Sequence, residues 1–387
     1  MAARMTQVAP VMFGVGALAS LGDQLKMLGS KKAIIITDKG VTGAGITSKV
    51  ESVVKEAGVQ CAVYDDCLSD APTDTIPLVA GAVRAAGADA IIALGGGSSI
   101  DTAKAASLII KNDRPITPDI TAPDKPPAPD VPIITIPTTS GTGSEVTIVG
   151  VVSDSKTSQK YGVFISGATL AIVDPELTIG VPPHLTAMTG MDTISHAIEA
   201  VTGVQRNPMS DLKGFEALRL ANAHLFDAVR DGKNIVAREG MSLASCFAGM
   251  AFNDSVTSLS HAISQAIAKS LHLHHGLICG LATPVQLELY ATAIPARIRK
   301  IGEIFGADIP YDATREQIGR IAADRIREFM SSIGIQSFEQ LGFSRKDVTK
   351  QTDALMEEFM IQFAPIEITR EVAEAALDRM CDYCGAD

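Results

Sequence analysis

The sequence lacks an excess of positive charge. Its 387 residues include 33 Lys and Arg against 44 Asp and Glu, so the formal net charge is −11 at pH 7. No cluster of Lys and Arg marks a basic face. Nucleic acids and anionic membranes are therefore poor partners on electrostatic grounds, and we expect neither.

Long apolar runs are also absent. No segment approaches the roughly eighteen uncharged apolar residues that a transmembrane helix requires. Residues 8–19 imitate the apolar part of a signal peptide, but Pro10, Gly14 and Gly16 interrupt them and Arg4 alone supplies the basic region. We therefore expect a mature, cytoplasmic protein.

Cysteine is scarce and scattered. The six cysteines do not have the spacing of a disulfide framework, which indicates a reducing compartment. Cys381 and Cys384 form the motif Cys-x-x-Cys, but no second pair lies beside it. We interpret the two as thiols of the C-terminal tail, with a redox or zinc site as the alternative. No internal repeat or low-complexity tract is apparent, and the length allows one large or two ordinary domains.

The first half of the chain alternates short β-rich runs with helical patterns. Such alternation predicts βαβ units and a parallel sheet covered by helices on both faces. The expected strands are 33–37, 60–64, 88–94 and 131–136, and the expected helices are 47–57, 75–86 and 99–110. The proline-rich segment 113–137 is interpreted as an ordered surface excursion, with a domain linker as the alternative.

The hydrophobic period changes to about 3.6 residues beyond residue 184, which predicts helices almost throughout the second half. The expected helices are 185–201, 209–230, 235–251, 258–270, 278–305, 314–333 and 369–383. The predicted fold class is an α/β domain over residues 1–184, with a parallel sheet and a nucleotide site, followed by an all-α domain over residues 185–387.

The second half carries two separated groups of potential metal ligands. Asp192 and His196 are four residues apart, so they lie on one face of the expected helix. His261 and His275 can join them only through the fold. Two imidazoles and a carboxylate, with one His to spare, suit Fe(II) or Zn(II). Taken alone, an Asp-x-x-x-His pair is more often a surface hydrogen bond.

Glycines and small hydroxyl side chains mark a potential nucleotide site in the first half. Residues 95–99 stand between a strand and a helix, where a bare backbone and the helix N-terminus could receive a diphosphate. Residues 138–144 could contact phosphate and ribose in the same way. In both places a plain tight turn is the alternative, and Asp101 alternatively only complements the helix dipole.

Asp38 ends the first expected strand. A carboxylate there can accept hydrogen bonds from an adenosine ribose and would repel a 2′-phosphate, which favours NAD over NADP. The alternative is an Asp that forms the turn before Lys39 and Gly40. The glycine loop follows this strand instead of preceding it, so the usual Rossmann fingerprint does not apply.

Five segments together resemble the iron-containing, or group III, alcohol dehydrogenases. They are residues 95–101, residues 137–145, residues 190–199, His261 and residues 275–276, which appear in that family's order and at its spacing. The resemblance covers essentially the whole chain. It implies a dehydroquinate synthase-like fold, an NAD(H)-linked oxidoreductase, Fe(II) with Zn(II) as the alternative, and a homodimer or larger homo-oligomer.

The resemblance also implies roles for individual residues. The implied metal ligands are Asp192, His196, His261 and His275. The implied cofactor contacts are Asp38, Gly95, Gly96, Gly97, Ser98, Ser99, Asp101, Thr138, Thr139, Thr142, Thr147, Lys160 and Leu185. The implied substrate pocket contains Val149, Phe252, Gln265 and His272.

Some residues depart from the commonest family pattern. Gln265 stands where many members carry a second His, and His272 and His274 replace an Asn-x-Pro pattern. His272 could restore a proton path, or it is a solvated loop residue. Together with Lys269 it could favour an aldehyde that carries a sulfonate or phosphonate, although a solvated Lys at a helix end is the simpler interpretation.

The expected reaction interconverts a small primary alcohol and its aldehyde by hydride transfer at a metal-polarised carbonyl. The substrate is expected to be a short aldehyde, with an anionic group as one option. The alternatives are a zinc polyol dehydrogenase of the glycerol type and a non-catalytic protein that binds a metal or a nucleotide.

Overall fold

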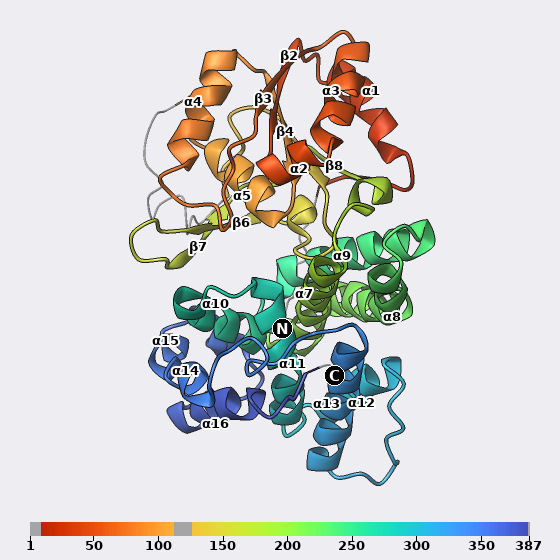
Figure 1. Cartoon of the computed structure of the whole chain (residues 1–387), viewed down its shortest axis with the longest axis vertical. Helices are drawn as coiled ribbons and strands as arrows, with labels where there is room; N and C mark the ends of the chain where they lie inside the picture. The colour runs from red at the N-terminus through yellow and green to blue at the C-terminus, as the bar shows by residue number, and fades with distance from the viewer. Residues whose placement is uncertain (1–8, 112–125, 386–387) are drawn as a thin grey trace. The chain divides into compact units, whose positions relative to one another are not determined.

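The computed structural model describes residues 9–111 and 126–385. They form two compact units that divide between Val181 and Pro182, which we name the α/β unit and the helical unit (Figure 1). That residue 184 ends the first of two domains stays a prediction. Much of the proline-rich segment 113–137, predicted to be a surface excursion, lies outside the described residues.

The α/β unit is built on a six-stranded sheet in the order β1-β8-β5-β4-β2-β3, with parallel pairing between all described neighbours. Its strands are β1 (Val11–Phe13), β2 (Lys32–Ile36), β3 (Gln60–Tyr64), β4 (Ala90–Gly95), β5 (Ile133–Pro137) and β8 (Leu170–Val173). The parallel sheet expected from the alternating pattern is confirmed.

Helices cover both faces of this sheet, with α4 and α5 on one face and α1 and α3 on the other (Figure 1). The helices are α1 (Leu21–Met27), α2 (Lys39–Gly43), α3 (Ile46–Glu56), α4 (Ile76–Ala86) and α5 (Gly97–Ala106). Each face has its own apolar core. Along β2, Ile34 and Ile36 belong to the core under α4 and α5, while Ala33 and Ile35 belong to the core under α1 and α3. Successive side chains of a strand point to opposite faces, so one unbroken apolar run fills both cores.

A second sheet of two antiparallel strands was not predicted. It pairs β6 (Val149–Ser153) with β7 (Lys160–Phe164), and a short 3-10 helix, η2 (Ser144–Val146), precedes it. Two further 3-10 helices in this unit are η1 (Ala17–Ser20) and η3 (Pro175–Thr178). The hairpin was missed because its strands are only partly buried and do not repeat the apolar pattern of the main sheet.

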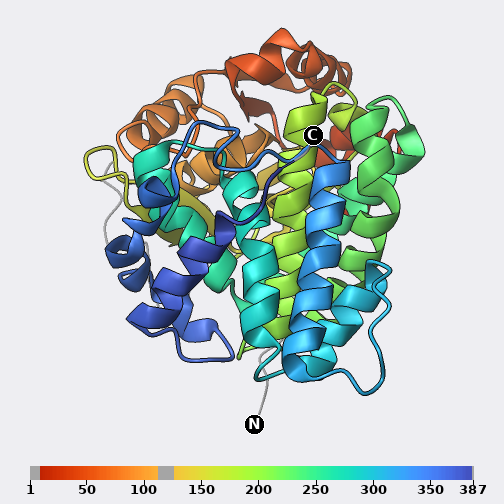
Figure 2. The ribbon, with the colours of Figure 1, turned by 60° about the horizontal axis from the view of Figure 1, so that its bottom comes forward.

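The helical unit contains only helices and their connections over its described residues, as expected. Its α-helices are α7 (Pro183–Thr202), α8 (Pro208–Arg230), α9 (Ile235–Ser255), α10 (Leu259–Leu271), α11 (His275–Tyr290), α12 (Pro295–Ile304), α13 (Arg315–Ser332), α14 (Arg345–Thr349), α15 (Thr352–Met356) and α16 (Arg370–Met380). A 3-10 helix, η4 (Phe359–Phe363), precedes α16. Figure 2 shows the long helices of this unit running side by side.

One helix prediction was wrong. The expected single helix over residues 278–305 is two helices, α11 and α12, because Pro295 occupies the first turn of α12. Proline is favoured at a helix start but lacks the N–H that a continuing helix would need. The helix α11 also begins at His275, three residues earlier than expected, so this imidazole lies in a first turn.

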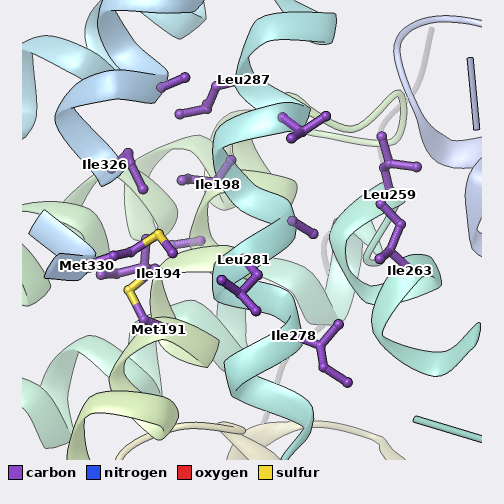
Figure 3. Close-up of a cluster of buried hydrophobic side chains, with 14 of the residues drawn as sticks. Met191, Ile194, Ile198, Leu259, Ile263, Ile278, Leu281, Leu287, Ile326 and Met330 are labelled. Carbon is purple, nitrogen blue, oxygen red and sulfur yellow. The ribbon is translucent and has the colours of Figure 1, made fainter. Parts of the chain in front are cut away.

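The central helix α7 is buried on more than one side. Met191, Ile194 and Ile198 pack into an apolar core with side chains from α10, α11 and α13 (Figure 3). The neighbouring stripe of the same helix carries Asp192 and His196, which are also buried. Among the described helices, none is both long and apolar enough to cross a membrane.

Candidate metal centre and nucleotide-binding edge

The helix α7 presents Asp192 and His196 on one face, a single turn apart. Oδ1 of Asp192 lies 3.7 Å from Nδ1 of His196. The Asp192 and His196 side chains are 4% and 7% exposed, so little water reaches either of them. The ring of Phe252, on α9, stacks on the His196 imidazole and fixes its orientation. The two ring centroids are 4.3 Å apart, and the interplanar angle is 14°.

Two other helices bring the remaining imidazoles to the same carboxylate. Nε2 of His261, on α10, lies 3.6 Å from Oδ1 of Asp192, and Nε2 of His275, on α11, lies 3.7 Å from it. Gly276 makes this approach feasible, since a Cβ atom there would meet the Met188 carbonyl oxygen of α7 at 2.3 Å. All four sequence-predicted metal residues therefore meet at one carboxylate oxygen.

The centre of this cluster fits a divalent cation. Oδ1 of Asp192 and Nε2 of His261 are buried and have no hydrogen-bond partner among the described residues. Leaving such atoms unpaired costs about 1–3 kcal/mol each, and a cation between them would remove that cost. Nitrogen and oxygen ligands at about 2.1 Å from a tetrahedral ion are roughly 3.4 Å apart, close to the distances found here.

The imidazoles also control the charge of Asp192. Burial raises the pKa of this carboxyl, but the adjacent His196, His261 and His275 outweigh burial and hold the pKa far below its usual range. The carboxylate form is therefore the one that faces the three rings. Three imidazole nitrogens and one carboxylate oxygen form a mixed donor set that suits Fe(II) and Zn(II).

Two side chains that the sequence reasoning missed orient the imidazoles. The carboxylate of Glu199 lies 2.5 Å from Nδ1 of His261, and the hydroxyl of Ser264 lies 2.7 Å from Nδ1 of His275. Each contact engages Nδ1 and leaves Nε2 directed at Asp192, as metal-binding histidines require. Helical spacing could have revealed both, since Glu199 follows Asp192 by two turns and Ser264 follows His261 by about one.

The expected pocket residues of the helical unit are in different surroundings. Phe252 contacts His196, and Gln265 is partly buried one turn after His261. His272 is exposed, and it ends α10 with a left-handed backbone at φ 52°. Leu185, expected as a cofactor contact, lies half-buried in the first turn of α7. The side chain of Lys269, invoked for an anionic substrate, lies outside the described residues.

In the α/β unit, the predicted nucleotide residues gather at one edge of the sheet. Asp38 follows β2, Gly95 ends β4 and Thr138 follows β5, and these three parallel strands are direct neighbours. Ligands of open α/β sheets bind at the carboxyl ends of the strands. This edge therefore brings together Asp38, Gly95 and Thr138, which are distant from one another in the chain.

The glycine loop has a backbone that side chains would obstruct. Gly95 has φ 143°, and a Cβ atom there would meet Ser99 at 2.9 Å. Gly96 is the N-cap of α5, with Gly97, Ser98 and Ser99 in the first turn, and no side chain caps this N-terminus. Its N–H groups are thus available to an anionic ligand.

Asp38 already has two partners in the fold. Its carboxylate accepts hydrogen bonds from the backbone N–H of Val41 and from the hydroxyl of Ser99, each at 3.0 Å. It thus caps α2, as the turn-forming interpretation expected, and it also lies beside the glycine loop, while its contact with a ribose stays a prediction. The hydroxyl residues Thr139 and Thr142 belong to the loop after β5.

Asp101 lies beyond the first turn of α5, so it does not complement the helix dipole there. Its carboxylate accepts hydrogen bonds from the Ser144 hydroxyl at 2.5 Å and from the Val151 N–H at 2.9 Å. It therefore holds η2 and β6 against α5. Burial raises the pKa of this carboxyl above its ordinary value, against the influence of Lys104.

Lys104 is fully buried beneath the same turn. Its ammonium donates to the hydroxyl of Thr147 at 3.1 Å and to the carbonyl of Val149 at 2.8 Å, and it also contacts Ser144. Burial lowers its pKa to about 8. Two expected contact residues, Thr147 for the cofactor and Val149 for the substrate, are thus positioned by a cation that the sequence reasoning missed.

Lys160, another expected cofactor contact, begins β7. Its ammonium lies 2.8 Å from the carboxylate of Asp70, and its side chain is 13% exposed while that of Asp70 is 61% exposed. The backbone N–H of Asp70 in turn donates to the hydroxyl of Ser98 at 3.1 Å. Lys160 is therefore linked through one residue to the glycine loop.

Comparisons with known proteins cover nearly the whole chain. A family model described as iron-containing alcohol dehydrogenase matches residues 9–175, and a C-terminal model of the Fe-containing alcohol dehydrogenase family matches residues 186–381. A sulfoacetaldehyde reductase from Bilophila wadsworthia is 33% identical over 89% of this chain and 90% of its own length. An NAD-dependent methanol dehydrogenase from Bacillus methanolicus is also 33% identical, over 93% of this chain and 95% of its own.

A solved structure gives the same result for the fold. The sulfoacetaldehyde reductase from Bifidobacterium kashiwanohense, in complex with NAD+, superposes with a TM-score of 0.88 at 28% identity. The match covers 98% of this chain and 99% of that one.

Proposed function

The chain belongs to the iron-containing alcohol dehydrogenase family, and from that premise we propose that it interconverts a small primary alcohol and its aldehyde with NAD(H). The family, the fold class and the enzyme class expected from the sequence are confirmed. The observation that carries the proposed chemistry is the convergence of three imidazole nitrogens on one oxygen of Asp192, at 3.6–3.7 Å.

We assign the metal to Asp192, His196, His261 and His275, with Fe(II) as the ion and Zn(II) as the alternative. A divalent ion held there would polarise the carbonyl oxygen of an aldehyde and stabilise the alkoxide of an alcohol. The residues of the chain supply the geometry. Glu199 and Ser264 hold two of the imidazoles in the tautomer and orientation that binding needs, and the Phe252 ring shields a third from water.

The nicotinamide dinucleotide is assigned to the glycine edge of the α/β unit. The uncapped N-terminus of α5 would receive its diphosphate, and Asp38 would accept from its ribose and repel a 2′-phosphate. NAD is supported by two relatives, one named as NAD-dependent and one solved with NAD+. The buried Lys104 keeps the turn with Thr147 in place beside this edge.

The substrate class is proposed to be a short aldehyde, with a sulfonate or phosphonate as the preferred option. Two sulfoacetaldehyde reductases among the similar proteins support an anionic group, while a methanol dehydrogenase of equal identity supports a small neutral one. His272 is exposed, so it is available either to a substrate or to solvent. The cytoplasmic location and the homo-oligomer stay predictions.

The test is a steady-state assay of purified protein loaded with Fe(II) under anaerobic conditions. We expect NADH consumption with acetaldehyde and sulfoacetaldehyde that requires the metal and is faster with the sulfonate. The variant His275→Ala should lose the activity, and the control His184→Ala, at an exposed position of α7, should keep it. Absence of turnover with every aldehyde, despite bound metal, would favour the non-catalytic binding protein, and preferential glycerol oxidation with Zn(II) would favour the polyol dehydrogenase.

A further inference from the structure

The connection between β3 and α4 contains two adjacent residues with an unusual backbone. Asp70 has φ 63° and Ala71 has φ 45°, and neither is a glycine. A side chain disfavours this left-handed region, so the surrounding structure must hold both residues in it. Backbone strain of this kind is concentrated at ligand sites, and this connection contacts the glycine loop of the predicted nucleotide edge.

Backbone hydrogen bonds hold the connection on two sides. The carbonyl of Ala71 accepts from the N–H of Ser153 at 3.2 Å, and the N–H of Thr73 donates to the carbonyl of Ser153 at 2.9 Å. On the other side, the N–H of Asp70 donates to the hydroxyl of Ser98 at 3.1 Å. The connection therefore joins the hairpin of β6 and β7 to the first turn of α5.

The side chain of Asp70 reaches the second strand of the same hairpin. Its Oδ1 lies 2.8 Å from the ammonium of Lys160, whose side chain is 13% exposed. A cation that has lost most of its water needs a partner, and a charge-assisted hydrogen bond from a carboxylate is a strong one. A lysine side chain is long and flexible, so this bond decides where the ammonium lies.

The backbone of Asp70 has a comparable effect on Ser98. The Ser98 oxygen accepts the N–H of Asp70, so the hydroxyl proton remains for another acceptor. Ser98 lies in the first turn of α5, whose N-terminus no side chain caps. A hydroxyl donor at this place adds to the backbone N–H groups that favour an anion. One residue thus orients two of the expected cofactor contacts, Ser98 and Lys160.

We infer that Asp70 is a positioning residue of the nucleotide site, which holds the Lys160 ammonium and the Ser98 hydroxyl where both can donate to the dinucleotide. This inference rests on the proposed function, which assigns NAD(H) to the glycine edge. Asp70 acts through these two side chains and needs no cofactor contact of its own. Without its carboxylate, the Lys160 side chain would turn its charged end towards water and leave the edge.

Anaerobic titration calorimetry of NADH with the Fe(II)-loaded, full-length protein tests the inference in the absence of aldehyde. Asp70→Asn keeps the backbone N–H and the size of the side chain but removes its charge, so NADH should bind about five- to tenfold more weakly. In steady-state kinetics the KM for NADH should rise by a similar factor, while kcat changes by less than about twofold. The control Asp74→Asn removes an equal charge from the same connection, at an exposed residue bonded to Ser155, and should bind NADH as the wild type does.

A double-variant cycle separates positioning from a purely structural role. Lys160→Met should weaken NADH binding, and addition of Asp70→Asn should cause little further loss, because the carboxylate then has no ammonium to position. A purely structural role would instead lower the unfolding temperature of Asp70→Asn and leave the Kd of the folded protein unchanged.

The outcomes separate this inference from the proposed function. Unchanged or tighter NADH binding in Asp70→Asn, or a fully additive loss in the double variant, would overturn the role of Asp70 and leave the proposed function standing. A wild-type protein that binds no NADH would overturn both.

Discussion

Two buried polar clusters, one in each unit, differ in how their atoms are satisfied. In the α/β unit, Asp101 and Lys104 are buried, and each has several hydrogen-bond partners within the fold. In the helical unit, atoms of Asp192 and His261 are equally buried but lack hydrogen-bond partners among the described residues. The first arrangement is complete without a ligand, whereas the second leaves buried atoms that the proposed cation would satisfy. Substitutions should therefore reduce stability in one unit and metal binding in the other.

The largest effect is expected for His261→Ala. The variant should lose bound metal and at least about a hundredfold in activity while it keeps its fold, because three ligands remain on a preformed scaffold. Elemental analysis, steady-state kinetics and circular dichroism measure the three quantities. Full metal occupancy in this variant would contradict the assignment of His261, and His184→Ala serves as the matched control.

The corresponding experiment in the α/β unit removes the buried ammonium group of Lys104. Lys104→Met should lower the free energy of unfolding by about 3–5 kcal/mol, because Asp101 and the oxygens around the ammonium lose their partner. Urea titration measures the change. Lys55→Met, which removes an exposed pair with Glu51, should cost less than about 1 kcal/mol. An equally small effect at Lys104 would remove the contrast between the two units.

A smaller effect is expected for Glu199→Gln. The amide keeps the size of the side chain but cannot hold His261 as a carboxylate does, so metal affinity should fall by about 10–100-fold. Chelator competition measures the affinity, and the pH dependence of binding should change with it. A purely structural role for Glu199 would instead lower the unfolding temperature and leave the affinity of the folded protein unchanged.

The smallest effect concerns the nucleotide edge. Asp38→Gly should raise the use of NADP relative to NAD roughly tenfold, equivalent to about 1.4 kcal/mol of removed repulsion. Glycine at the N-cap of α2 costs only a few tenths of a kcal/mol, so stability should be nearly unchanged. The ratio of kcat/KM values for the two cofactors is the measurement. If NADP discrimination stayed the same, Asp38 would be a capping residue alone.

Local patterns predicted four of the six strands of the main sheet and most helices, because the apolar periods of those elements are long and regular, whereas β1 and β8 were not predicted. Two errors of the secondary-structure prediction, one in a helix and one in a hairpin, have local causes. Pro295 divides a continuous apolar pattern into two helices, and the partly buried hairpin of β6 and β7 gives little periodic signal. The parallel pairing, by contrast, followed directly from the alternation of strand and helix patterns.

The candidate metal centre was less accessible to residue patterns. Spacing paired Asp192 with His196, but His261 and His275 could be joined to them only by family resemblance, since tertiary packing sets those distances. Glu199 and Ser264 were missed although their helical spacing from Asp192 and His261 is a usable signal. Only the tertiary contacts show which imidazole each side chain meets.

The burial of α7 on two stripes has a practical consequence for protein engineering. Its residues 191, 194 and 198 fill a core, and residues 192, 196 and 199 surround the proposed cation site. The helix therefore has few positions at which a new side chain could be accommodated. Libraries that aim to change substrate preference should therefore leave this helix intact. Diversity is better introduced on α10 at Gln265, a predicted pocket residue that is only partly buried.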